Sequence, residues 1–182
     1  MKLLNIISMN KITAFVLSLF LCACNNSQKA NMNNIISFEG INIETDITSF
    51  CDSLEKRGYE KIDVPNDAQS YTNFIIFYGN VANKEATINV YKDSLSQSVS
   101  YIKSAMKFEQ KEEVLENVNS LIEYFKEKYP NAEYKTLNED NKVEYYFFTS
   151  PILVCISSTE LQNGEYMVLI DYDNTKLYNQ KE

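Results

Sequence analysis

The stretch DITSFCDSLEKR, residues 46–57, predicts a helix with a single apolar face. Asp46 or the preceding Thr45 can cap its first turn, and Gly58 follows the last turn, where glycine is favoured. The apolar residues recur at the i, i+3, i+4, i+7 spacing of one helical stripe. Such a helix needs a hydrophobic surface to cover. The stripe consists of Ile47, Phe50, Cys51 and Leu54.

A second stretch, KEEVLENVNSLIEYFKEK at residues 111–128, predicts a longer helix of the same kind. Acidic residues occupy its first turns and lysines its last turn, which suits the helix dipole. Pro130 ends the helix, because proline disfavours helical backbone in the residue before it. The stripe consists of Val114 or Leu115, Val118, Leu121, Ile122 and Phe125.

The segments between and after these helices predict β-strands, because they are rich in β-branched and aromatic residues. Gly79-Asn80 is expected as a tight turn between the first two strands, and Asn163-Gly164 is a strong hairpin signal. The polar residues 138–141 predict a further turn. The expected strands are 71–79, 81–92 and 96–104 in the first half, and 143–149, 152–158 and 165–172 in the second.

A weak internal repeat relates the two halves at an offset of 71 residues. Leu54 in the first helix maps onto Phe125 in the second, and the segment 74–77 maps onto 145–148. The alternative is that any two helix-then-strand segments of similar length would align this well. The sequence predicts an α+β fold, an antiparallel sheet with two helices on one face, built from two α-β-β-β-like repeats.

This order of elements resembles the tandem-repeat architecture of the β-lactamase inhibitor protein family. The opening Phe38-Glu-Gly40-Ile41-Asn-Ile43, followed by a capped helix, also resembles small uncharacterised bacterial lipoproteins. The resemblance spans residues 35–172 as a pattern of elements. It implies the fold and transfers no functional residue. This chain lacks the disulfides that the inhibitor proteins have within each repeat.

Residues 1–23 predict the signal peptide of a bacterial lipoprotein. Two lysines supply a positive region, Ile12–Ala23 supplies an apolar segment, and Leu21-Cys22-Ala23-Cys24 resembles a lipobox. Cys24 is then the lipid-attachment residue. An ordinary secretory signal is one alternative. A membrane-spanning helix is another, but it needs about 20 apolar residues, more than this segment offers.

We therefore expect a mature chain held at a membrane by acyl chains on Cys24, palmitate among them. Residues 24–34 predict a flexible tether. Residues 35–182 predict a single α+β domain with pseudo-repeats at 35–108 and 109–182. The expected location is the cell envelope, at the outer rather than the inner membrane. Whether the domain is periplasmic or surface-facing stays open.

The net charge and the absence of histidine limit the classes of function that we expect for this chain. The precursor has 17 basic and 25 acidic residues, and loss of Lys2 and Lys11 with the signal peptide leaves 15 against 25, a net charge of −10. Nucleic acid is not an expected partner, because phosphate binding needs clustered positive charge. The chain has no histidine, the commonest general base and metal ligand. We predict no enzyme activity, no cofactor and no metal site.

Two local features concern metal binding and disulfide formation. Asp171-Tyr-Asp173-Asn174 is the closest approach to a metal motif, but a calcium loop needs more carboxylates and usually a glycine. Cys51 and Cys155 could pair in an exported protein, yet both lie in apolar segments, where a cysteine packs as a small hydrophobic residue. The Cα separation decides between these alternatives, so the sequence leaves them open.

Tyrosine is abundant, with 13 copies, and several lie in expected strands. Tyrosine offers a large rigid surface and a hydroxyl for recognition, although strands also favour aromatic residues structurally. We expect a membrane-anchored, non-enzymatic binding or assembly module whose partner is a protein, peptide or glycan. The alternatives are a structural accessory subunit of an envelope complex and an unrecognised enzyme. The candidate binding face consists of Tyr71, Tyr78, Tyr91, Tyr101, Tyr145, Tyr146 and Tyr166.

Overall fold

The computed structural model describes residues 35–63, 73–139 and 142–177, which all fall within one compact unit, Asn33–Glu182. The predicted tether lies outside the described residues. The elements are α2 (Ile47–Lys56), β1 (Glu60–Ile62), β2 (Phe74–Val81), β3 (Lys84–Lys92), β4 (Val99–Phe108), α4 (Lys111–Lys128), β5 (Glu133–Glu139), β6 (Lys142–Thr149), β7 (Ile152–Glu160), β8 (Tyr166–Asn174) and the 3-10 helix η3 (Thr175–Leu177).

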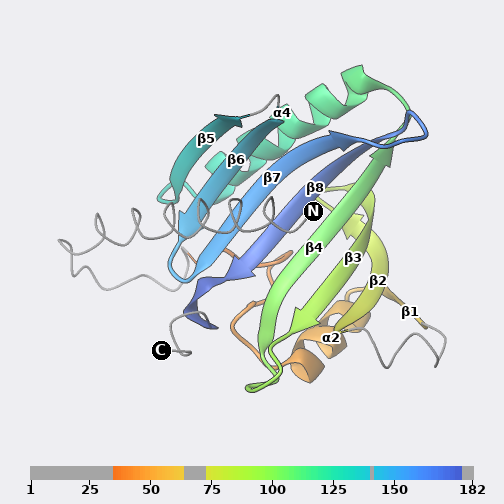
Figure 1. Ribbon diagram of the computed structural model, residues 1–182. Helices are drawn as coiled ribbons and strands as arrows, with labels where there is room; N and C mark the ends of the chain where they lie inside the picture. The colour runs from red at the N-terminus through yellow and green to blue at the C-terminus, as the bar shows by residue number, and fades with distance from the viewer. Residues whose placement is uncertain (1–34, 64–72, 140–141, 178–182) are drawn as a thin grey trace, which may run out of the picture. The chain divides into compact units, whose positions relative to one another are not determined.

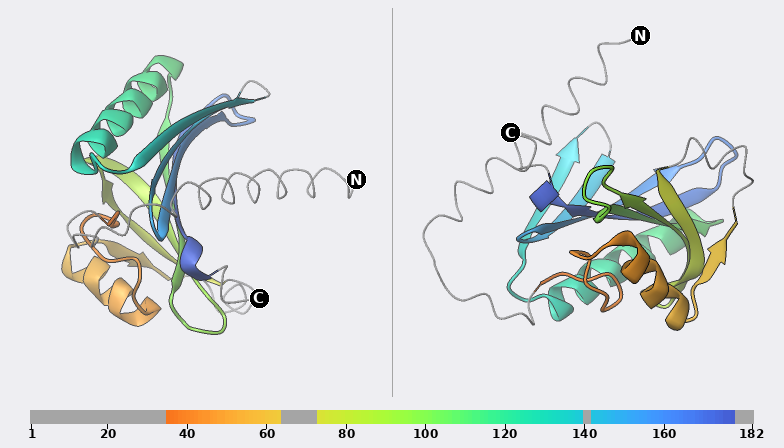
Figure 2. Two further views of the ribbon diagram at one scale, coloured as in Figure 1. Left: turned by 90° about the vertical axis from the view of Figure 1, so that its left-hand side faces the viewer. Right: turned by 90° about the horizontal axis from the view of Figure 1, so that it is seen from below.

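The strands form one sheet in the order β1-β2-β3-β4-β8-β7-β6-β5, and every neighbouring pair is antiparallel. Each half of the chain runs as a meander, and β4 pairs with β8 at the centre. Both helices lie on the same side of this twisted sheet (Figures 1 and 2). The predicted α+β fold is confirmed.

The helix stripes pack as their spacing predicts. In α2 the four predicted stripe residues are buried. In α4 the stripe contains Val114 and not Leu115, because Val114 is buried whereas Leu115 is 56% exposed. Neither described helix is long and apolar enough to cross a membrane.

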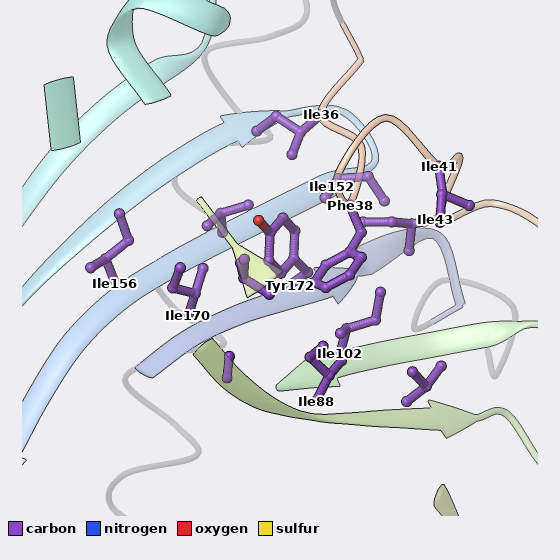
Figure 3. Close-up of a cluster of buried hydrophobic side chains, with 14 of the residues drawn as sticks. Ile36, Phe38, Ile41, Ile43, Ile88, Ile102, Ile152, Ile156, Ile170 and Tyr172 are labelled. Carbon is purple, nitrogen blue, oxygen red and sulfur yellow. The ribbon is translucent and has the colours of Figure 1, made fainter. Parts of the chain in front are cut away.

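The core lies between the helices and the sheet. The Phe125 ring of α4 is centred 5.2 Å from that of Phe147 on β6 and 6.1 Å from that of Tyr172 on β8. The segment before α2 packs into the same core, with the ring of Phe38 centred 5.3 Å from Tyr172. Isoleucines from that segment and from the strands surround this pair (Figure 3), namely Ile36, Ile41, Ile43, Ile88, Ile102, Ile152, Ile156 and Ile170.

The first hairpin turn was predicted at the wrong place. β2 continues through Gly79-Asn80 to Val81, and the turn is Ala82-Asn83, whose φ angles are +50° and +66°. Gly79 has another role, because a Cβ there would lie 2.3 Å from Cδ1 of Tyr59. The glycine therefore makes room for an aromatic ring instead of turning the chain.

Two strands were not predicted. β1 and β5 are the edges of the sheet, and the described side chains of β5 lack an alternating apolar pattern, as is usual where one flank of a strand meets solvent. Of the turn predicted at 138–141, Asn138 and Glu139 belong to β5, and 140–141 lie outside the described residues. Each half is thus a helix followed by four strands, instead of three.

The strand order is symmetric, since β1 to β4 mirror β5 to β8 about the central β4–β8 pair. Duplication would produce this arrangement. The internal repeat itself stays a prediction, because similar element order also arises without common sequence.

We expect Asp46→Ala to lower the unfolding midpoint at neutral pH. Oδ1 of Asp46 accepts a hydrogen bond from the backbone N–H of Ser49 at 2.9 Å and caps α2. The hydrogen bonds with Ser49 lower the pKa of Asp46 below its usual 3.8, so the stabilisation is present above that pH and is lost as pH falls through the folded-state pKa. Urea unfolding against pH measures this. A difference between wild type and variant that does not shrink in acid contradicts the capping role, and Asp52→Ala on the exposed side of α2 is the control.

Candidate binding face

Strand alternation gives the sheet two faces. One packs against the helices and carries the core. The other, here called the free face, has neither described helix over it. Cross-strand register aligns the side chains of the free face in rows. One row is Phe74, Tyr91, Tyr101, Asp173, Leu153 and Phe148, and the next is Ile76, Asn89, Lys103, Asp171, Cys155 and Tyr146.

The structure separates the predicted tyrosines into two groups. Tyr78, Tyr91, Tyr101 and Tyr146 lie on the free face. Tyr145 and Tyr166 lie on the helix-covered face and pack against the core, so their assignment to the binding face was wrong. The two remaining predicted site residues, Tyr71 and Cys24, lie outside the described residues.

Three rings form a continuous aromatic row across β2, β3 and β4. The ring centroids of Phe74 and Tyr91 are 4.9 Å apart, and those of Tyr91 and Tyr101 are 5.3 Å apart. The rings are tilted by 45° and 58° to one another, within the range of favourable aromatic contacts. All three side chains are half-buried, so they are held by their neighbours and still present surface to solvent.

Tyr101 also connects this row to the next one. Its hydroxyl donates a hydrogen bond to the carboxylate of Asp171. Burial raises the pKa of Tyr101, and the Asp171 carboxylate raises it further. Burial raises the pKa of Asp171 as well, against the opposing effect of this hydrogen bond. The buried Oδ1 of Asp171 has no hydrogen-bond partner among the described residues.

A second polar group surrounds Tyr146 on β6. Its hydroxyl donates to a carboxylate oxygen of Glu144, and Nζ of Lys142 lies 2.5 Å from the other oxygen. Burial would raise the pKa of Glu144, but the hydrogen bonds from Lys142 and Tyr146 lower it below the usual value. Tyr146 is only 9% exposed although it faces away from the helices. Tyr146 therefore supports the structure of the free face and offers a binding partner little surface.

Cys51 and Cys155 are both free and lie on opposite sides of the sheet. Cys51 is buried under α2, whereas Cys155 lies on the free face between Asp171 and Tyr146. The disulfide left open by the sequence does not form. Burial raises the pKa of Cys155 to about 12, so its thiol stays protonated at neutral pH and is a poor nucleophile.

The Asp171–Asn174 motif is divided by strand alternation. Asp171 and Asp173 lie on the free face, whereas Tyr172 is buried in the core and Asn174 is buried at the end of β8. Across the described ranges, no group of three or more His, Cys, Asp or Glu side chains comes close enough to hold a metal ion.

A cavity of about 220 Å³ adjoins the end of the aromatic row, with Tyr101 in its lining. The loop from β3 to β4 forms part of its rim. That loop is held by Asp93, whose Oδ2 accepts backbone hydrogen bonds from Leu95 at 3.1 Å and Ser96 at 2.8 Å. The other lining residues are Asn73, Lys92, Asp93, Ser94, Ser100, Asn174 and Leu177.

Sequence reasoning missed Phe74, Asp171 and this cavity. Phe74 stands in the same predicted strand as Tyr78, and a search for aromatic residues in general would have included it. Asp171 and the cavity depend on the pairing of β4 with β8, which no local pattern reveals. No known protein family, curated protein or solved structure matches this chain.

Proposed function

We propose that this chain is a membrane-anchored, non-enzymatic binding module of the cell envelope, with the free face as its binding surface. The aromatic row carries this proposal. Phe74, Tyr91 and Tyr101 place three adjoining rings on a face that neither described helix covers. Rigid aromatic surface with attached hydroxyls is the composition that recurs at the centre of binding interfaces.

The polar groups beside the row support binding over catalysis. The hydroxyl of Tyr101 is engaged with Asp171, and Glu144 is engaged with both Lys142 and Tyr146. The thiol of Cys155 is held protonated. Groups paired in this way hold side chains in place, and a thiol that stays protonated is a poor nucleophile.

The lipoprotein-like start of the sequence supports the membrane anchor. Acylation at Cys24, followed by the polar residues to Asn34, would tether the domain to the membrane. An outer-membrane location in the envelope is part of the same proposal.

A structural accessory role is the second candidate, and the edge strand β5 favours it. Glu133–Glu139 pairs only with β6 among the described strands, so its outer backbone edge can accept a strand from another subunit. In this case the sheet edge, and not the free face, would make the contact.

A photo-crosslinking amino acid at two exposed positions tests the proposal in intact envelopes. Tyr78 on the free face is 39% exposed, and Leu115 on the outer side of α4 is 56% exposed. We expect specific crosslinked products from position 78 and none from position 115, because only the first lies on the binding surface. Products from position 115 alone contradict the free-face proposal, and products from neither position contradict a protein partner on this face. A third probe at the exposed Thr136 in β5, which pairs with Tyr145 and so does not lie on the free face, reports on the edge alternative.

We expect Cys24→Ala to abolish acylation. The acyl chain is attached through the cysteine thiol, and alanine offers no acceptor. Metabolic labelling with a palmitate analogue should mark the wild type alone, and the variant should persist as a larger precursor or appear in the soluble fraction. Cys22→Ala is the matched control and should label normally. Equal labelling of wild type and Cys24→Ala contradicts the assignment.

A further inference from the structure

We propose that the aromatic row and the cavity beside it bind an oligosaccharide. This proposal rests on the proposed function of the free face and names the class of its ligand. A sugar ring stacks on Tyr91 and Tyr101, and its hydroxyls enter the cavity next to Tyr101. The two parts are continuous, because Tyr101 belongs to the row and also lines the cavity.

The row matches the apolar side of a pyranose. One face of such a sugar consists of C–H groups, which pack against the face of an aromatic ring by hydrophobic contact and weak C–H···π attraction. Phe74, Tyr91 and Tyr101 follow one another at centroid spacings of 4.9 and 5.3 Å. Three consecutive rings offer more surface than one sugar covers, so the site fits a chain of sugars better than a monosaccharide.

The cavity matches the polar side of the same ligand. Hydroxyl groups both donate and accept hydrogen bonds, so they need a lining of both kinds. Lys92 supplies donors, Asp93 supplies acceptors, and Ser94, Ser100, Asn73 and Asn174 supply both. The volume of about 220 Å³ admits part of a sugar ring with its hydroxyls. Leu177 is the one aliphatic side chain in this lining, so an apolar ligand finds little to contact.

Asn174 supplies a further observation. Its Nδ2 donates to the backbone carbonyl of Val99 at 3.2 Å, which fixes the orientation of the amide. Its Oδ1 is buried and has no hydrogen-bond partner among the described residues, although the side chain is only 3% exposed. An unsatisfied buried acceptor is destabilising. A hydroxyl of the bound sugar can supply the missing donor.

Strand topology and charge disfavour a peptide at this position. β2, β3, β4 and β8 each pair with a strand on both sides, so their backbone groups are not free to add a peptide strand. The charges of Lys92 and Asp93 in the cavity oppose each other, which leaves no net charge to select a strongly cationic or anionic segment. A neutral, hydroxyl-rich ligand fits both conditions.

Saturation-transfer NMR on the full chain in detergent tests this proposal with two probes. One is chitotetraose, a neutral β-1,4-linked tetramer of N-acetylglucosamine, which represents the sugar backbone of the cell-wall glycan. The other is cellotetraose, which represents a neutral external glucan. At millimolar sugar we expect transfer to the ring C–H protons of at least one probe, and the probe that binds identifies the source of the glycan.

The variants locate the site. Tyr91→Ala should weaken sugar binding about tenfold, because it removes the central ring of the row. Tyr91→Phe keeps the ring and should retain most of the binding. Leu115→Ala removes an exposed side chain on the outer side of α4, away from the free face, and should leave binding unchanged. Asn73→Ala, at an exposed position of the cavity, should weaken binding severalfold. Thermal unfolding of each variant confirms that it folds.

Two outcomes overturn the proposal. Binding of neither sugar excludes an oligosaccharide of these classes at the site. Sugar binding that Tyr91→Ala and Asn73→Ala leave unaltered places the sugar elsewhere. Neither outcome decides the proposed function, because photo-crosslinking at position 78 still reports whether the free face meets another partner. Loss of crosslinks together with retained sugar binding would instead limit the free face to glycan recognition.

Discussion

Phe125→Asp is expected to unfold the domain. Phe125 is buried at the centre of the core, where its ring contacts Phe147, Tyr172 and Tyr129 from three different parts of the chain. Truncating a buried Phe costs about 3–5 kcal/mol, and an unpaired buried charge adds several more. A domain of this size has about 5–15 kcal/mol of stability in total. Circular dichroism at room temperature should show loss of the folded state.

Three further variants test whether this effect depends on the buried face of each helix. Leu54→Asp makes the same change under α2, where Leu54 is fully buried, and should have the same effect. Glu55→Ala and Glu123→Ala lie on the outer sides of the two helices and should change stability by no more than about 0.5 kcal/mol. Glu123 pairs with Lys126 at 3.1 Å, but exposed ion pairs contribute little. Similar effects of the buried and exposed substitutions would show that the helix faces are assigned wrongly.

Gly79→Ala is expected to destabilise the domain by about 1–3 kcal/mol, as overpacking of a filled site does. Alanine is otherwise acceptable in a strand, so the cost comes from the contact with Tyr59. A Cβ at position 79 would lie 2.3 Å from Cδ1 and 2.8 Å from Cε1 of that ring. The ring cannot easily move, because its hydroxyl donates to the Asn80 carbonyl at 2.6 Å and its centroid lies 6.4 Å from that of Phe38.

A double-mutant cycle separates this contact from any general effect of alanine. In a Tyr59→Ala background the ring is absent, so Gly79→Ala should then cost little or even stabilise the strand by reducing backbone freedom in the unfolded chain. Denaturant unfolding of the four proteins measures the coupling. An equal cost in both backgrounds would exclude the steric explanation and assign the effect to the backbone.

The sequence by itself determined the features that depend on local periodicity. The stripe Ile47, Phe50, Cys51 and Leu54 fixed one helix, and the stripe ending at Phe125 fixed the other, because residues three and four apart share a helix face wherever the helix lies. Asp46 and Gly58 marked the ends of α2 for equally local reasons. From the two helices and the strands between them, the α+β class followed.

Only the tertiary structure decided which residues meet across strands. Alternation required Tyr145 and Tyr146 to face opposite ways, but the packing of Phe147 under α4 decided that Tyr145 shares the core and Tyr146 the free face. The pairing of β4 with β8 brought Asp171 to Tyr101. These contacts join segments far apart in the chain, and their register is set by how the whole core packs. No local pattern contains that information, so the aromatic row could be suspected from the sequence while its polar neighbours could not.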